Sequence, residues 1–209
     1  EIRPRDWSSD VCSSDLRGVE TFAGESFHTA RWPREKVDLR GKRVGVIGTG
    51  STAIQLIPEI APEVGHLTVF QRTANYACPL RNSPITDAEQ RDIKARYDEI
   101  FARCRRTFAS FMQESDPRRT FDVSPEERLR FYEEVWAMPG FHKWFGLFQD
   151  IMTDEAANEC YAEFVRGKIR ERVKDPAVAE LLTPRDHPFG AKRIPLETGY
   201  YETFNRDNV

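Results

Sequence analysis

The sequence predicts an α/β fold: a partial Rossmann-type dinucleotide-binding domain with a large all-helical insertion. Three observations predict it. An apolar run at 44–47 leads through glycines into a helical pattern, a β-branched run follows at 66–70, and residues 84–183 show helical periodicity. About 30 residues from strand to strand is the length of one parallel crossover. We therefore expect a βαβ unit over 41–83, followed by the insertion.

The composition is that of an ordinary globular protein. Among 209 residues, 39% are hydrophobic and 31% charged, and the net charge is −3. This balance gives no reason to expect nucleic acid or an anionic membrane as a partner. No apolar run approaches the roughly 20 residues of a spanning helix. The N-terminus lacks a basic-then-apolar secretory pattern, so the expected localisation is cytoplasmic.

The four cysteines are far apart in the sequence: Cys12, Cys78, Cys104 and Cys160. None belongs to a C-x-x-C pair, so the spacing suggests neither a zinc ribbon nor a dithiol redox centre. This argues against a disulfide reductase and favours reduced thiols. The sequence also offers no metal-ligand cluster and no nucleophile–base arrangement.

The first 16 residues differ from the rest. From Asp6 to Leu16 the chain repeats Ser-Ser-Asp without any apolar period. The run resembles a sequencing adapter translated in frame, so we expect residues 1–16 to be foreign and unstructured. A flexible Ser/Asp-rich linker is the alternative. Ordinary codon usage continuous with the downstream gene would refute the adapter origin.

Capping signals and apolar stripes predict helices throughout the insertion. Thr86 and Glu89 form a capping box, and Pro125 follows Ser124 at a first helical position. The expected helices cover a stripe from 86 to 112, then 124–139, an aromatic stripe at 141–152, 154–173 and a short segment from 175. Residues 184–209 show little regular period and are expected to form a returning loop without a further strand.

The glycine-rich turn carries the first chemistry. Gly48-x-Gly50-x-x-Ala53 lies between the first strand and its helix, the context in which this pattern binds dinucleotides. Gly48 permits the tight turn, Gly50 lets backbone approach a pyrophosphate, and Ala53 allows close helix packing. The pyrophosphate would lie at the helix N-terminus. The expected cofactor-binding residues here are Gly48, Thr49, Gly50, Ser51, Thr52, Ala53 and Gln55.

The end of the second strand favours NADPH over NADH. An NAD site carries an acidic residue there, which binds the ribose 2′-hydroxyl. This sequence has Gln71-Arg72-Thr73 instead. The Arg72 guanidinium suits a 2′-phosphate, and Thr73 can donate a hydroxyl to the same group. A solvated surface charge is the alternative reading of Arg72.

A second motif lies upstream, in residues 17–40. Its spacing is F-x-G-x-x-x-H-x-x-x-W-P, given by Phe22, Gly24, His28, Trp32 and Pro33. This is the fingerprint of type I Baeyer–Villiger monooxygenases, which the chain resembles from about residue 18 to 209. Segments 70–73, 192–193 and 200–206 resemble that family too, in its chain order.

The resemblance implies an enzyme that uses NADPH and FAD. In the family, NADPH reduces FAD, oxygen adds, and the peroxyflavin converts a ketone into an ester or lactone. Arg193 matches the catalytic arginine that stabilises the peroxyflavin anion, and Lys192 matches a residue that binds the NADPH phosphate. His28 would position an interdomain linker over 17–40 by hydrogen bonding, with Phe22 and Trp32 packed as anchors.

Parts of the family pattern are absent from the sequence. The FAD-binding G-x-G-x-x-G loop does not occur, nor do the later strands of either nucleotide domain. We therefore expect a fragment, truncated after 184–209, with no turnover and at best weak NADPH binding. Two alternatives stay open: a flavin-containing N- or S-oxygenating monooxygenase, whose fingerprint lacks Trp-Pro, and a non-catalytic NADPH-binding or helical interaction module.

Overall fold

The computed structural model describes residues 18–209, which fall into two compact units with a boundary between Asp38 and Leu39. The predicted foreign segment 1–16, with Cys12, lies outside the described residues. The described part of the first unit holds two 3₁₀ turns, η2 (Val19–Thr21) and η3 (Thr29–Arg31). All other helices and strands described below belong to the second unit.

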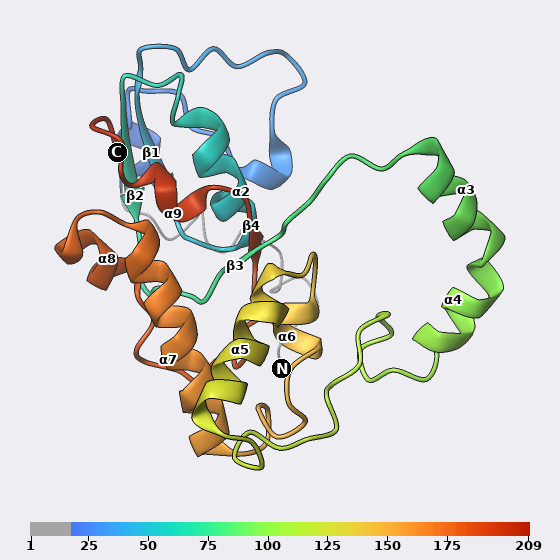
Figure 1. The fold of residues 1–209 in the computed structure, drawn as a ribbon. Helices are drawn as coiled ribbons and strands as arrows, with labels where there is room; N and C mark the ends of the chain where they lie inside the picture. Colours follow the sequence, from blue (N-terminus) through green and yellow to red (C-terminus); the bar gives the residue numbers. More distant parts are fainter. Residues whose placement is uncertain (1–17) are drawn as a thin grey trace, which may run out of the picture. The chain divides into compact units, whose positions relative to one another are not determined.

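A parallel strand pair joined by a helix opens the second unit (Figure 1). β1 (Arg43–Ile47) pairs with β2 (His66–Phe70), in a register from Arg43 opposite His66 to Ile47 opposite Phe70. α2 (Ser51–Ile60) connects them. The strand, helix and strand predicted from the apolar pattern are therefore present, in a mixed α/β fold.

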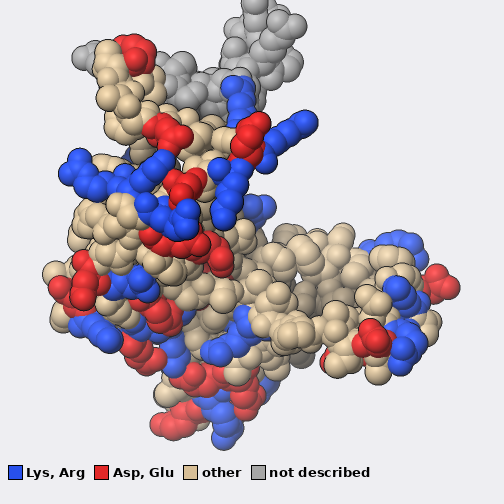
Figure 2. All heavy atoms as spheres, turned by 90° about the horizontal axis from the view of Figure 1, so that it is seen from above, with Lys and Arg blue, Asp and Glu red and all other residues tan. Residues whose placement is uncertain are grey.

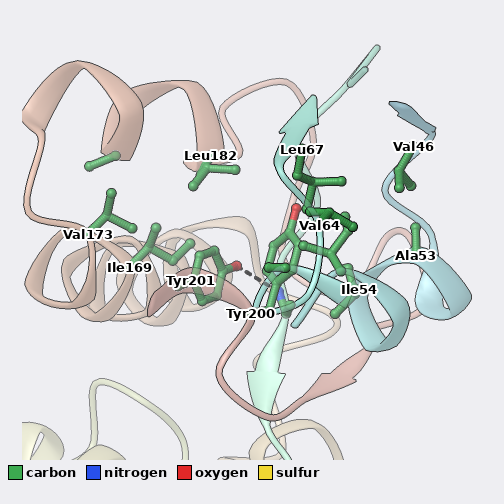
Figure 3. Packing of buried hydrophobic residues seen from close by; sticks show 14 residues of the cluster. Val46, Ala53, Ile54, Val64, Leu67, Ile169, Val173, Leu182, Tyr200 and Tyr201 are labelled. Atoms are coloured by element: carbon green, nitrogen blue, oxygen red, sulfur yellow. Dashed lines mark hydrogen bonds between the residues drawn. The ribbon is translucent and has the colours of Figure 1, made fainter. Parts of the chain in front are cut away.

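The first core lies between this strand pair and the last helices of the chain. Val46 and Leu67 of the strands are buried in the same cluster as Ile54 and Ile57 of α2 (Figure 3). Ile169 and Leu182, from far along the chain, complete the cluster. Burying side chains of this size stabilises a fold by about 1.5–3 kcal/mol each. The 84–183 segment therefore helps to hold the βαβ unit.

A second strand pair was not predicted. β3 (Cys78–Pro79) pairs in parallel with β4 (Leu196–Glu197), and α9 (Tyr200–Thr203) follows. The Ala77 N–H donates to the Tyr201 hydroxyl at 3.2 Å (Figure 3). The expectation that 184–209 lacks a strand was wrong, because a strand of two residues leaves no period in the sequence.

Three of the expected helices of the 84–183 segment are confirmed. They are α5 (Pro125–Ala137), α7 (Glu155–Arg172) and α8 (Pro176–Leu182). Each begins with a side-chain cap: Ser124 accepts from the Glu127 N–H, and Asp154 accepts from the Ala157 N–H. Asp175 caps α8 in the same way. Local capping chemistry was therefore a reliable signal.

Two helix predictions were wrong in extent. The 86–112 stripe forms two shorter helices, α3 (Asp87–Ala95) and α4 (Tyr97–Cys104), and Phe108 lies beyond them, almost fully exposed. The Thr86–Glu89 capping box is present. The 141–152 stripe forms only α6 (His142–Phe145), because residues 147–149 bond instead to 116–118.

The aromatic residues of this region build a second core. Phe148 is buried and its ring lies 4.3 Å from the ring of Phe131. Tyr132 and Tyr161 pack edge to face at 4.8 Å. These aromatic residues therefore pack against the helices, although only 142–145 of the predicted 141–152 stripe are helical.

Basic and acidic side chains are interspersed on the face drawn in Figure 2, without a large patch of one sign. Among the described helices, none is long and apolar enough to cross a membrane.

Candidate functional site

The carboxyl ends of β1 and β2 form the edge at which the predicted binding residues begin. Gly48 follows β1 with a φ of +95°, and its N–H donates to the carbonyl of Phe70 at 2.9 Å. Such a φ favours glycine over any residue with a side chain. The tight turn predicted at Gly48 is therefore present.

Gly50 differs from Gly48 in a way that bears on binding. Its φ of −75° suits any residue, and a Cβ built on it would meet no atom within 4 Å. Neither the backbone nor the neighbouring side chains therefore require glycine at this position. The open space beside Gly50 suits close approach of a ligand to the backbone, as the sequence predicts.

The N-terminus of α2 faces this space. Gly50 is its N-cap and provides no side-chain cap, so the first N–H groups keep their donors for an anion. Ser51 is half-buried, Thr52 and Gln55 are exposed, and Ala53 is buried against the strands. The end of α2 thus presents backbone donors and hydroxyl groups together.

The segment after β2 lies beside the glycine turn. The Thr49 hydroxyl donates to the carbonyl of Thr73 at 3.4 Å, and Gln71 donates through Nε2 to the carbonyl of Leu181 at 2.7 Å. Arg72, held between these anchors, is exposed, and its guanidinium bonds to none of residues 18–209. It is therefore a positive charge available to a ligand.

The loop before β4 brings a second arginine to the same place. Arg193 donates from Nη2 to the Ser51 hydroxyl at 3.3 Å, at the first residue of α2. Lys192 beside it is exposed, and its charge is one of the causes that lower the pKa of Asp186, after the hydrogen bond from His187. Segments 48–55, 71–75 and 192–193 thus meet at one edge.

Buried side chains hold the loop that carries Lys192 and Arg193. The Asn158 side chain of α7 makes two hydrogen bonds to the Phe189 backbone, accepting from its N–H and donating to its carbonyl, both at 2.9 Å. Arg166 donates through Nε to the carbonyl of Pro184 at 2.9 Å. Gly190 has a φ of +83°, and a Cβ there would run into Met152 at 2.7 Å. The loop is therefore firmly anchored.

A chain of three polar side chains ties the same loop to the end of β2. Asn75 donates through Nδ2 to the carbonyl of Arg193 at 3.2 Å, and its Oδ1 lies 3.1 Å from Nε2 of His187. Nδ1 of His187 lies 2.6 Å from the Asp186 carboxylate. Sequence reasoning missed Asn75, Asn158 and His187, because isolated polar residues form no motif.

The fingerprint residues lie in the first unit, which is described here by itself. A Cβ on Gly24 would lie 2.7 Å from the Phe22 ring, so a larger residue there would displace this exposed ring. His28 accepts the Ala30 N–H through Nδ1 at 3.2 Å and caps η3, a local structural contact. The Trp32 ring lies 5.7 Å from Phe27.

The aromatic fingerprint residues remain exposed despite these local contacts. Phe22 is 64% exposed and Trp32 is 41% exposed, while Pro33 is half-buried. Their expected role as linker anchors stays a prediction. Among residues 18–209, no group of three or more His, Cys, Asp and Glu side chains could hold a metal ion.

Comparison with known sequences identifies clear relatives, although no family model matches the chain. It is 49% identical over 201 residues to the 2-oxo-Delta(3)-4,5,5-trimethylcyclopentenylacetyl-CoA monooxygenase of Pseudomonas putida. It is 47% identical over 195 residues to a Baeyer–Villiger monooxygenase of Pseudooceanicola batsensis. Each alignment covers 93% of this chain, but 37% and 35% of the relative.

The names of two further relatives indicate different reactions. Cyclohexanone 1,2-monooxygenase of Acinetobacter sp is 44% identical over 93% of this chain and 36% of its own length. Phenazine N-monooxygenase PhzNO1 of Lysobacter antibioticus is 39% identical over 96% of this chain and 37% of its own length. Relatives of this segment therefore include ketone and N-oxygenating enzymes.

Solved structures agree with the sequence comparison. The fold matches a crystal structure of OTEMO in complex with FAD and NADP with a TM-score of 0.91 and 48% identity. The match covers 93% of this chain and 38% of that one. The chain therefore spans little more than a third of the relatives it matches, and over that length it is homologous to Baeyer–Villiger monooxygenases.

Proposed function

We propose that this chain forms the NADPH-binding part of an FAD- and NADPH-dependent monooxygenase that converts ketones into esters or lactones. The observation that carries the proposal is the Arg193–Ser51 contact, which joins a cationic loop to the N-terminus of α2. It gathers backbone donors and a guanidinium around the open space at Gly50. An anionic ligand with several phosphates suits such a site.

The proposed organisation follows the chain order. Residues 17–40 would form an interdomain linker, 41–83 a βαβ unit of a partial Rossmann-type domain, 84–183 a helical insertion, and 184–209 the returning loop. The parallel pairing of β3 with β4 supports the insertion, because the chain leaves and re-enters at adjacent strands. Ile169 and Leu182 in the first core indicate that the insertion is packed onto the domain.

The pyrophosphate would bind where α2 begins. Its oxygens would accept the free N–H groups of the first turn, with Ser51 and Thr52 as further donors. Thr49 and Gln55 would border the same ligand. Gly50 would allow the approach, since it leaves open the space that a side chain would fill.

The 2′-phosphate would bind at the end of β2. The Arg72 guanidinium, unpaired within the described chain, can make two parallel charge-assisted hydrogen bonds to it. Thr73 would add a hydroxyl and Lys192 a second positive charge. These three groups favour NADPH over NADH, because a phosphate is anionic where NADH carries a neutral hydroxyl.

Arg193 would act nearest the chemistry. When bound, NADPH supplies a hydride and FAD activates dioxygen. The Arg193 guanidinium stays protonated throughout and would stabilise negative charge that develops beside it. Its tether to Ser51 would keep that charge oriented without reorganisation during the reaction.

The test needs this sequence within a protein as long as its relatives, supplied with FAD, NADPH and dioxygen. A cyclic ketone should trigger NADPH consumption, with one equivalent of lactone formed and detected by mass spectrometry. Arg193→Ala should abolish the lactone, whereas NADP⁺ should still bind, with weakened affinity. NADPH consumption without any oxygenated product from a panel of ketones contradicts the proposal.

N-oxygenation is the second candidate, and the likeness to phenazine N-monooxygenase PhzNO1 favours it. The Trp32-Pro33 ending of the fingerprint favours ketone oxidation instead. Competing a ketone against an aromatic N-heterocycle and a tertiary amine in one assay separates the two. A chain that binds NADPH tightly and supports neither reaction would be a non-catalytic binding module.

A further inference from the structure

The Arg72 side chain has no partner in the described chain that fixes its direction. It is exposed, and its guanidinium bonds to none of residues 18–209. Binding a ligand therefore orders this long side chain together with any mobile backbone beside it, and each group that becomes ordered costs affinity. Contacts that hold the backbone of Arg72 before the ligand arrives lower this cost.

Three side-chain hydrogen bonds hold the segment around Arg72. On one side, Gln71 donates through Nε2 to the carbonyl of Leu181 at 2.7 Å. On the other side, the carbonyl of Thr73 accepts from a hydroxyl at 3.4 Å, and Asn75 donates to a loop carbonyl at 3.2 Å. The Gln71 bond is the shortest of the three, and its donor directly precedes Arg72. Its acceptor lies in the helical segment 84–183, whereas the other two bonds end within the binding edge.

The acceptor of the Gln71 bond is itself well fixed. Leu181 lies in the last turn of α8, where carbonyl groups lack partners within the helix. The Thr183 hydroxyl donates to one of these carbonyls, that of Ala179, at 2.7 Å, and Gln71 donates to another. Leu182, the next residue, is 6% exposed and packs in the first core (Figure 3). This end of α8 therefore gives Gln71 a firm attachment point.

We propose that Gln71 is a positioning residue that raises the preference for a coenzyme with a 2′-phosphate, because it ties the backbone before Arg72 to α8. The inference rests on the proposed function, in which Arg72 is assigned to that phosphate. It gives the helical segment a part in coenzyme choice, although none of the three groups assigned to the 2′-phosphate lies in it. A helix cap alone would stabilise α8 and leave the relative affinities of the two coenzymes unchanged.

The measurement is the affinity of the 209-residue chain for NADP⁺ and for NAD⁺, in the wild type and in Gln71→Met. Methionine is about as long as glutamine but has no donor and no charge. NADP⁺ should bind about threefold to tenfold more weakly to Gln71→Met, which is the value of one hydrogen bond. NAD⁺ should bind as it does to the wild type, so the ratio of the two affinities should fall by the same factor. This ratio is insensitive to partial unfolding, because both coenzymes bind the same folded population.

Two further variants show whether the bond itself matters. Gln149→Met is the matched control, because Gln149 also donates through Nε2 to a backbone carbonyl, that of Pro117 within the helical segment. It should leave both affinities unchanged. Gln71→Asn keeps the amide but is one methylene group too short for the bond, so its ratio should fall as in Gln71→Met. It also serves as the test where Gln71→Met does not fold.

A double variant shows whether Gln71 acts through Arg72. In an Arg72→Ala background, Gln71→Met should not lower the ratio further, whereas an equal further loss refutes the positioning role. A wild-type ratio in both Gln71→Met and Gln71→Asn also refutes it, while the preference of the wild type for NADP⁺ still supports the proposed function. A wild type that binds the two coenzymes equally, or binds neither, refutes the proposed 2′-phosphate site and the inference with it.

Discussion

The Arg193 guanidinium donates to the Ser51 hydroxyl at 3.3 Å across 142 residues of sequence. One partner begins α2, and the other lies in the loop that returns from the helical segment. The contact adds a full positive charge to a helix end that already favours anions. It is the feature that joins the predicted binding residues to the predicted catalytic residue.

A double-mutant cycle measures this contact. Ser51→Ala and Arg193→Ala should each weaken NADP⁺ binding, and the double variant should lose less than the sum. The expected coupling is about 0.5–1.5 kcal/mol, the net value of one hydrogen bond. Titration calorimetry on the four proteins gives it. Strict additivity contradicts a direct contact in the bound state.

The two glycines of the turn should respond differently to substitution. Gly48→Ala places a side chain at a φ of +95° and should destabilise the fold by about 1–3 kcal/mol. Gly50→Ser should leave stability unchanged, because serine is a favoured N-cap and its Cβ meets nothing in the chain.

Gly50→Ser should nevertheless weaken NADP⁺ binding about tenfold or more, since the side chain fills the proposed ligand space; tenfold corresponds to about 1.4 kcal/mol. Urea unfolding and NADP⁺ titration of both variants provide the comparison. Unchanged affinity in Gly50→Ser shows that the ligand does not approach there.

Substitution of Glu197 in β4 should destabilise the fold strongly. Glu197 is fully buried, accepts from Arg172 Nη1 at 2.7 Å and from the Tyr200 N–H at 2.9 Å. Glu197→Ala removes the fully buried partner of Arg172, whose side chain is 19% exposed, and should cost about 3–5 kcal/mol.

Glu202→Ala is the matched control, because Glu202 binds the same arginine but is half exposed. Its cost should stay near 0–1 kcal/mol. Urea unfolding of both variants checks the difference. Similar costs for the two glutamates contradict the role assigned to burial.

Lys143 should make stability depend on pH. Burial lowers its pKa to about 8 from 10.5, and its Nζ donates to the Met138 carbonyl. As the pH falls from 10.5 to 8, the unfolded state takes up a proton that the folded state does not. The free energy of unfolding therefore falls over this window and stays low below it.

Lys143→Met should remove that dependence and raise stability at pH 7 relative to pH 10, by at most about 3 kcal/mol. The quantity to compare is the difference in free energy of unfolding between Lys143→Met and the wild type at each pH. This matters because burial raises the pKa of Cys78, which lowers the stability of both proteins above pH 9. A difference that does not change between pH 7 and 10 contradicts the lowered pKa of Lys143.

Local signals predicted much of the fold. The turn at Gly48, the caps at Ser124, Asp154 and Asp175, and the apolar runs of β1 and β2 all depend on neighbouring residues. Such features are encoded within a few positions, so a sequence displays them directly.

Long-range pairing explains what was missed. The two-residue strands β3 and β4 lie more than 100 residues apart and are too short to produce a periodic pattern in the sequence. The helix predicted over 141–152 is shortened because residues 147–149 form backbone hydrogen bonds with 116–118 instead. The hydrogen-bonded chain from Asp186 through His187 to the Arg193 carbonyl includes Asn75, whose two partners lie 112 and 118 residues away in the sequence. Single polar residues become meaningful only when the fold brings them together.

The central claim is that Arg72 binds the 2′-phosphate on the adenosine ribose, and a coenzyme titration tests it most directly. The 209-residue chain should bind NADP⁺ at least about tenfold more tightly than NAD⁺, a difference of about 1.4 kcal/mol. Arg72→Glu should abolish or reverse this preference. Arg43→Glu, the same charge change at the opposite end of β1, should not. Equal affinity for the two coenzymes, or a preference for NADP⁺ that survives Arg72→Glu, contradicts the account.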